Sequence, residues 1–291
     1  MPVDTAAREQ AVSAAIREIS HIATLPEITL RIIQLVEDPT STAQDLHAVI
    51  AKDPALCTRI LKVVNSAFYG LPGQIGSINR AIVLLGLNAV KNIAIAASLA
   101  KLFKGGQLSP RFAAKDIWTH SVAVAAGARA IAQVMRLSLT DEAFLAGLIH
   151  DIGIMVEMQY DRTKLVEVVD RCEAGGDGAG MLAVEDEVFN ANHQDFGSGL
   201  CDKWKFPRSF MHVTGFHHRP LELPADHRAL TCIVATADRL AGALNIGFRL
   251  DLSSTDIPAD YLDELKLTAE QVDEIRDKLP DQIADAQQVI T

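Results

Sequence analysis

The chain has 291 residues, of which 49% are hydrophobic and 22% are charged, so it can bury a sizeable core and is not intrinsically disordered. Acidic residues outnumber basic ones by 37 to 27, and the resulting net charge of −10 disfavours nucleic acid as the main partner. No two of the four cysteines have C-x-x-C spacing, and the N-terminus lacks the apolar core of a signal peptide. We therefore expect a cytoplasmic protein with reduced cysteines.

Helical periodicity dominates the first hundred residues. The predicted helices are 5–22, 25–38, 43–52 and 54–64, then a turn-rich loop at 65–77 and a long apolar helix at 78–103. The stretch 81–100 is long enough to cross a membrane, but Asn88, Lys91 and Asn92 lie in its middle. A central lysine costs about 2.5–3.5 kcal/mol on insertion scales. The sequence therefore predicts a buried helix and no membrane span.

The segment GGQLSP, residues 105–110, is the clearest break in the chain and predicts a domain boundary. The helices predicted after it are 111–135, 141–158, 161–174, 180–190, 194–203, 207–216 and 227–244. The last forty residues are more charged and predict one or two short surface helices. We thus expect an all-α protein with an N-terminal helical subdomain (1–105), a helical bundle (106–250) and a C-terminal helical tail (251–291).

Strongly polar residues interrupt three apolar helices of the predicted bundle. His150 and Asp151 end the apolar run AFLAGLIHDIGIMV, Asp238 lies in LTCIVATADRLAGAL, and His120 lies in DIWTHSVAVAAGARAIA. Since an unpaired buried carboxylate is very costly, each of these groups needs a partner. Gly153 permits close backbone approach beside the first pair. Buried helices that each contribute a His or Asp are typical of a metal site in a helical bundle.

Three further histidines, His193, His217 and His218, complete the candidate set. Mixed imidazole and carboxylate ligands suit Fe, Mn, Zn or Ni, and carboxylate with water also admits Mg. Two ions would need a bridging carboxylate, for which Asp151 is the natural choice, and such a pair would activate a water and neutralise a phosphoryl oxygen. Basic residues that could contact a phosphate are Lys205, Arg208, Arg219 and Arg239. A metal-free alternative is a hydrogen-bond network that only fixes the bundle.

These motifs resemble a known family. GLIHDIG at 147–153 resembles the His-Asp motif of the HD superfamily of metal-dependent phosphohydrolases, and the chain from about 20 to 240 resembles its HDOD (HD-related output domain) branch. The other matching segments are LPEITLRIIQLVEDP (25–39), IAKDPALCTRILKVVNSAFYG (50–70), IGSINRAIVLLGLNAVKNIAI (75–95), IWTHS (117–121), HQDFGSGLCDKWKFP (193–207) and FHH (216–218). The resemblance implies an N-terminal helical subdomain packed on an HD-like helical bundle.

The resemblance also assigns the ligands. His120 corresponds to the first histidine of the HD superfamily, His150 and Asp151 to the HD pair, and Asp238 to the distal aspartate. The remaining three, His193, His217 and His218, correspond to the extra histidines of the HD-GYP branch of cyclic-di-GMP phosphodiesterases. The sequence departs from that branch at Ile154, where HD-GYP proteins have a lysine, and at 217–226, which lacks the Gly-Tyr-Pro segment. A metal site without its phosphate contact is therefore expected.

HDOD domains resemble output modules of bacterial signalling proteins, so the first functional hypothesis is a bacterial regulatory protein with one or two divalent metal ions. Its helical N-terminal half would bind a signalling protein partner. The alternative is a metal-dependent phosphohydrolase that acts on a nucleotide or cyclic dinucleotide, with Asp151 as the catalytic residue.

Overall fold

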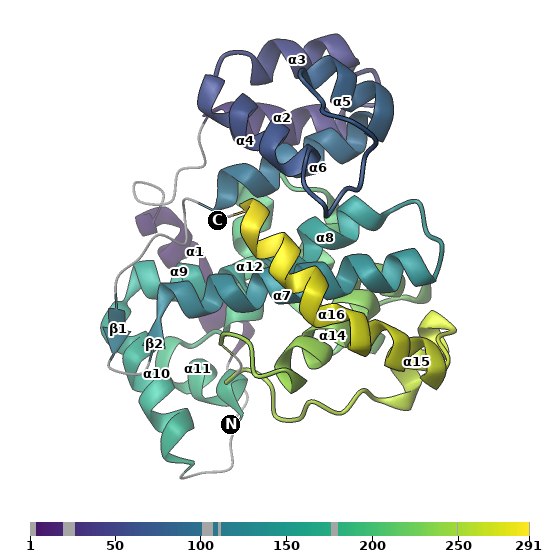
Figure 1. Ribbon diagram of the computed structural model, residues 1–291. Coiled ribbons are helices and arrows are strands. Elements are labelled where there is room, and N and C mark those ends of the chain that lie inside the picture. Colours follow the sequence, from purple (N-terminus) through teal and green to yellow (C-terminus); the bar gives the residue numbers. More distant parts are fainter. Residues whose placement is uncertain are drawn as a thin grey trace.

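The computed structural model describes residues 4–19, 27–100, 107–109, 112–175, 180–248 and 250–290. In these ranges the chain is almost entirely α-helical, which confirms the predicted all-α class (Figure 1). The strands found there are β1 (Gln107–Ser109) and β2 (Phe112–Ala113), which form one short antiparallel pair. None of the described helices combines the length and the apolar character that crossing a membrane requires.

The helices of the first hundred residues begin at local capping groups. Their bounds are α1 (Thr5–Glu18), α2 (Glu27–Glu37), α3 (Ala43–Ile50), α4 (Pro54–Val64), α5 (Ile78–Leu85) and α6 (Leu87–Leu99). The side chain of Asp53 accepts a hydrogen bond at the start of α4, and that of Ser77 does the same for α5. The predicted single helix over 78–103 is wrong, because Gly86 has a φ of 90° and divides it into α5 and α6. Residues 101–103 lie outside the described ranges.

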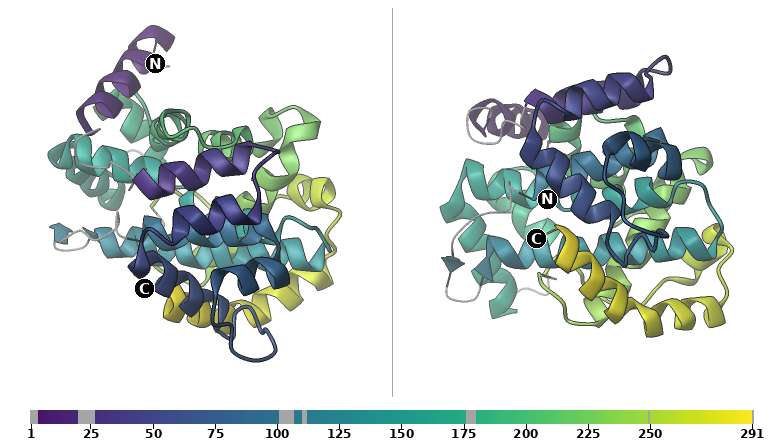
Figure 2. Two further views of the ribbon diagram at one scale, coloured as in Figure 1. Left: turned by 90° about the horizontal axis from the view of Figure 1, so that it is seen from above. Right: turned by 45° about the horizontal axis from the view of Figure 1, so that its top comes forward.

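Helix α1 packs away from the next helices. The helices α2 to α5 form a cluster at the top of Figure 1, whereas α1 lies against α9 and α12 (Figures 1 and 2). Val12 and Ile16 fill the space beside Gly199 of α12. Arg8 of α1 forms ion pairs with Asp186 and Asp195. The division of the chain at residue 105 stays a prediction. Helix α1, although it precedes residue 105, packs on α9 and α12, which follow it.

Helix α7 (Ala114–Val134) is the axis of the bundle. It packs against α8 (Thr140–Ile149), α14 (Arg228–Ala243) and α16 (Ala269–Ile290). Small residues permit this close packing, because a side chain at Gly147 would come within 2.8 Å of the backbone of Ala125. The buried apolar residues of α2 to α6 and of this bundle form one continuous core.

The other helices cover the ends and flanks of α7. They are α9 (Ile152–Tyr160), α10 (Arg162–Ala174), α11 (Met181–Phe189), α12 (His193–Lys203), α13 (Arg208–Phe216) and α15 (Ala259–Leu265), with short 3₁₀ turns at Pro220–Glu222 and Ala225–His227. The predicted helix 141–158 is wrong, since the chain divides into α8 and α9 at His150 and Asp151.

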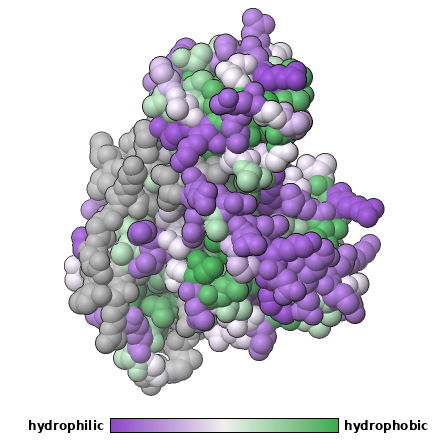
Figure 3. Space-filling model, viewed as in Figure 1, coloured by the Kyte–Doolittle hydropathy of each residue, from purple (hydrophilic) through white to green (hydrophobic). Residues whose placement is uncertain are grey.

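The C-terminal tail is more than a surface layer. Instead of short surface helices only, it contains the 22-residue helix α16, which buries Val272, Ile275, Leu279 and Ile283 in the core. Its outer side and α15 are hydrophilic on the face shown in Figure 3. Helix α16 therefore has the apolar stripe of an amphipathic helix and belongs to the bundle.

Candidate metal centre

The seven residues predicted as metal ligands converge in the core of the bundle. They come from α7, from the junction of α8 and α9, from the start of α12, from the residues directly after α13, and from the middle of α14. In chain order they are His120, His150, Asp151, His193, His217, His218 and Asp238. All except His218 have 0% of their surface exposed. Residues that are scattered over more than a hundred positions of the chain thus share one buried site.

The break between α8 and α9 positions the His-Asp pair. His150 ends α8 and Asp151 precedes α9, so both side chains face the same centre, with His150 Nε2 3.2 Å from Asp151 Oδ2. A side-chain carbon at Gly153 would lie 1.8 Å from the carbonyl oxygen of His193. Only glycine permits that backbone contact, as the sequence indicated. The contact brings His193 Nε2 to 3.8 Å from Asp151 Oδ1.

Three of the histidines are oriented in the same way. The Nδ1–H groups of His150 and His217 donate to the carbonyl oxygens of Gly147 and Val213, at 2.7 and 3.1 Å. His193 Nδ1 donates to the Glu185 carboxylate at 2.8 Å. These partners assign the proton to Nδ1 and leave the lone pair of each Nε2 directed inward. Metal-binding histidines are held in this way by an acceptor on the other ring nitrogen.

The candidate ligands form overlapping groups. One group contains Asp151, His193, His217 and His218, and a second contains His120, His150 and Asp238. Within each group the ligating atoms lie within 4.8 Å of one another. A further aspartate, Asp251, forms a group with His120 and Asp151 and another with His218 and Asp238. The ligand-type atoms of the site thus fall into adjacent groups that share residues.

Many polar atoms of the centre are buried without a hydrogen-bond partner. They are both carboxylate oxygens of Asp151 and of Asp251, Asp238 Oδ2, His120 Nδ1, and the Nε2 atoms of His150 and His217. Buried polar atoms are nearly always satisfied, and leaving one unsatisfied is costly. A dry hydrogen-bond network, the metal-free alternative, would still leave both Asp251 oxygens, Asp238 Oδ2 and His120 Nδ1 unsatisfied. The donor set therefore fits divalent cations.

The charges in the centre favour an ionised Asp151 beside the neutral imidazoles of His217 and His218. Burial opposes ionisation of Asp151, but the charge of His150 and the close approach of the His150, His217 and His193 imidazoles hold the pKa of Asp151 well below its usual range. Burial lowers the pKa of His217, and burial with the nearby imidazoles lowers that of His218. Neutral imidazole and ionised carboxylate are the protonation states that bind metal.

Sequence reasoning missed two acidic residues of this site. Glu185 accepts hydrogen bonds from both the ring and the backbone N–H of His193. It lies on the apolar face of α11, beside the buried Met181, Val184 and Phe189, and this position could have revealed it. The second missed residue is Asp251, which lies outside the helices and carries no periodic signal.

Three of the four basic residues proposed as phosphate contacts, Lys205, Arg219 and Arg239, make contacts elsewhere in the structure. Lys205 pairs with Asp202 at 3.3 Å, and Arg219 pairs with Glu222 at 3.4 Å. The guanidinium of Arg239 lies over the ring of Tyr261. Ile154, at the position where the HD-GYP branch has a lysine, is fully buried.

Comparisons with known proteins agree with this architecture. A curated protein of Treponema pallidum without a characterised function is 25% identical over 238 residues, which is 81% of this chain, and this chain spans only 45% of its length. A structure from Marinobacter aquaeolei, whose name proposes a signal transduction protein, superposes with a TM-score of 0.77 at 21% identity and covers 99% of this chain and 66% of its own.

A structure from Shewanella amazonensis, whose name proposes a phosphohydrolase, superposes with a TM-score of 0.72 at 21% identity and covers 96% of this chain and 98% of its own. These structural likenesses show the shared fold. Residues 22–220, more than half of the chain, match the HDOD domain family. The chain therefore belongs to the HDOD domain family.

Proposed function

We propose that this protein is a cytoplasmic bacterial regulatory protein whose buried His-Asp centre binds one or two divalent metal ions and whose helical N-terminal part binds a signalling partner. One observation carries the proposal. Eight buried ligand-type atoms converge without hydrogen-bond partners, an arrangement that a metal ion would satisfy.

Two metal positions would use different residues. One would be held by Asp151, His193, His217 and His218, and the other by His120, His150 and Asp238. The imidazole content favours Fe, Mn, Zn or Ni. When bound, such ions supply Lewis acidity and lower the pKa of coordinated water.

Two features favour regulation over catalysis. The candidate phosphate contacts Lys205, Arg219 and Arg239 have their described contacts outside the centre. The cluster α2 to α5 exposes the apolar side chains of Val83, which is 73% exposed, and Leu84. Exposed apolar side chains on one helix suit a contact with another protein. The related fold from Marinobacter aquaeolei, named for signal transduction, supports the same assignment.

Metal quantification tests the proposal most directly. Protein expressed in medium supplemented with Fe, Mn and Zn and purified without chelators is expected to retain at least one equivalent of transition metal. Asp238→Asn should lower that content, whereas Asp260→Asn, on the surface of α15, should not. Wild-type protein that contains no metal and binds none on titration would contradict the proposal.

The second candidate is a metal-dependent phosphohydrolase that acts on a nucleotide or cyclic dinucleotide. The observation in its favour is the position of Asp151, whose two oxygens face His217 at 3.2 Å and His150 at 3.2 Å, so that it can contact both metal positions. Carboxylates shared between metal ions are typical of two-metal hydrolytic sites. Protein reconstituted with Mn²⁺ or Fe²⁺ should be assayed against a nucleotide panel. Turnover that Asp151→Asn abolishes would favour this candidate.

A further inference from the structure

Asp251 is buried beside the candidate metal centre without a partner of its own. It lies in the segment between α14 and α15, outside the residues 22–220 that match the family. Only 5% of its surface is exposed, and neither carboxylate oxygen has a hydrogen-bond partner. The imidazole of His218 lies nearby, with its Nε2 3.8 Å from Asp251 Oδ2.

The backbone before Asp251 is fixed against the helix that carries His120. Asn245 and Gly247 have φ values of 55° and 73°, which turn the chain after α14 back across α7. A side-chain carbon at Gly247 would lie 2.4 Å from the backbone nitrogen of His120. The N–H of Phe248 donates to the carbonyl oxygen of Asp116 at 3.0 Å. The contacts of Gly247 and Phe248 with α7 thus hold the chain close to the centre shortly before Asp251.

The carboxylate of Asp251 lies close to residues of both candidate ligand groups. A carboxylate oxygen of Asp251 lies within 4.8 Å of ligand atoms of His120 and Asp151. A carboxylate oxygen of Asp251 also lies within 4.8 Å of ligand atoms of His218 and Asp238. Its neighbours therefore include two other aspartates, whose negative charges repel it. Carboxylates that are buried together need a cation, because unpaired buried charge is strongly destabilising. A bound cation would account for both the placement and the unpaired oxygens.

We infer that Asp251 would serve as a further ligand of the metal centre, within reach of residues of both candidate groups, and would link the C-terminal helices α15 and α16 to metal occupancy, an inference that rests on the proposed metal centre. A carboxylate has two oxygens and can contact two ions at once. Bound metal would pull the 250–258 segment toward α7, and α16 packs on α7 as well. The C-terminal region would then be most stable in the metal-loaded protein.

Asp251→Asn tests this inference, with Asp256→Asn as the matched control on the exposed side of the same segment. Full-length apo proteins are titrated with Mn²⁺ by calorimetry, and their metal content is measured after loading. We expect Asp251→Asn to weaken Mn²⁺ binding by at least about 10-fold and to reduce the metal-induced rise in Tm, because it removes a direct ligand. Asp256→Asn should behave like the wild type.

The outcomes separate this inference from the proposed function. Wild-type protein that binds no Mn²⁺ or other transition metal contradicts the proposed function itself. Equal Mn²⁺ affinity of wild type and Asp251→Asn overturns the role of Asp251 and leaves the metal centre standing. If Asp251→Asn does not fold, hydrogen exchange of the wild-type protein with and without Mn²⁺ tests the inference instead. Protection over 250–258 and 269–290 should rise when Mn²⁺ is added, and unchanged protection there overturns the inference.

Discussion

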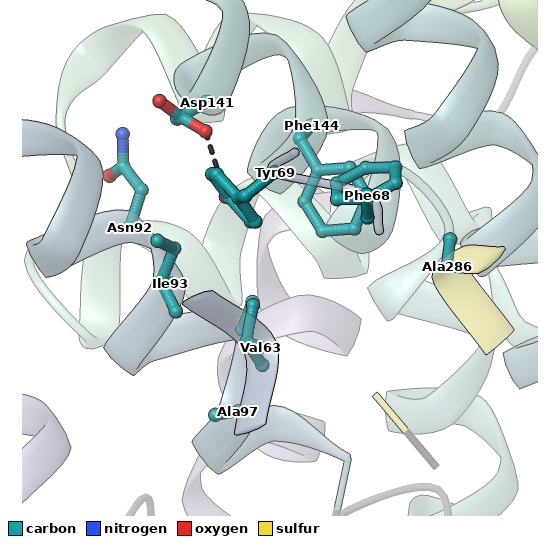
Figure 4. A pocket seen from close by; sticks show the side chains of 10 residues that line it. Val63, Phe68, Tyr69, Asn92, Ile93, Ala97, Asp141, Phe144 and Ala286 are labelled. Carbon is teal, nitrogen blue, oxygen red and sulfur yellow. Dashed lines mark hydrogen bonds between the residues drawn. The ribbon is translucent and has the colours of Figure 1, made fainter. Parts of the chain in front are cut away.

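Two buried polar clusters of this protein differ in where their charges find partners. In the aromatic contact, made by Phe68, Tyr69, Arg129, Asp141 and Phe144, the partners belong to the protein. Figure 4 shows Tyr69 directed at Asp141, close to Phe68 and Phe144. The hydroxyl of Tyr69 donates to Asp141 at 2.8 Å, and the guanidinium of Arg129 lies 4.1 and 4.3 Å from the ring centres of Phe68 and Tyr69. In the His-Asp centre, by contrast, carboxylate oxygens and imidazole nitrogens stay unpaired.

The same helices carry both clusters. His120 and Arg129 lie on α7, and α8 has Asp141 in its first turn and His150 directly after its end. The aromatic contact joins the loop after α4 to this helix pair and leaves one orphaned atom, Arg129 Nη1, which lies 3.8 Å from the Asp141 carboxylate. The His-Asp centre, a few turns away, leaves eight buried polar atoms without a hydrogen-bond partner. The comparison teaches that burial of polar groups alone does not indicate a ligand, whereas burial without internal partners does.

Metal removal should have the largest effect on stability, and only the His-Asp centre should respond. At a free metal concentration of 1,000 times Kd, one bound ion stabilises the folded state by about 4.1 kcal/mol. A chelator should therefore lower the Tm strongly, and re-addition of metal should restore it. Differential scanning calorimetry measures this change. An unchanged Tm in protein shown to have lost its metal would remove the distinction between the two clusters.

Gly153→Ala should be the most damaging single substitution near the centre. The added carbon would lie 1.8 Å from the carbonyl oxygen of His193, so α9 and α12 must separate. Overpacking of this kind costs about 3 kcal/mol. Urea unfolding should show that loss together with weaker Mn²⁺ binding. Gly180→Ala, where a side chain meets nothing within 4 Å, is the control and should cost little.

Glu185→Gln should weaken metal binding more than it weakens the fold. The amide keeps the shape of the side chain but removes the charge that orients the His193 ring. Loss of such a partner typically costs about 10- to 100-fold in metal affinity. Titration with Mn²⁺ measures the change, and Glu187→Gln, on the exposed side of α11, is the control. A Glu185→Gln protein with wild-type affinity would show that His193 needs no orienting carboxylate.

Mn²⁺ affinity should rise with pH up to about 9. Burial lowers the pKa of His193, but the charge and hydrogen bond of Glu185 outweigh it and raise the pKa to about 9. The resulting ion pair stabilises the metal-free protein fully below the ordinary pKa of 6.5 and is lost as the pH rises through about 9. Since the ring must lose this proton to bind metal, affinity should increase by up to about 10-fold per pH unit in that window. Calorimetry at several pH values tests this, and Glu185→Gln should flatten the slope.

The sequence predicted which polar residues converge better than it predicted how the chain brings them together. A histidine or aspartate inside an apolar helix is conspicuous, so His120 and Asp238 could be found from sequence alone. The break at His150 could not, because the apolar pattern continues through it from α8 into α9. Asp251 could not be recognised from the sequence, because it lies in a non-helical segment and meets its neighbours only in the folded chain. The apolar stripe of α16 was present in the sequence but was obscured by its many charges.

The smallest effect is expected at the aromatic contact. Tyr69→Phe removes the hydroxyl that donates to Asp141 but keeps the ring beside Arg129. Because Arg129 Nη1 remains 3.8 Å from Asp141, the carboxylate keeps a charged neighbour, and the loss should be about 1 kcal/mol. Urea unfolding measures it, with Tyr160→Phe as the control. Mn²⁺ affinity should stay at the wild-type value, since none of the candidate metal ligands belongs to the aromatic contact. A parallel loss of Mn²⁺ affinity would show instead that α7 and α8 couple the two clusters energetically.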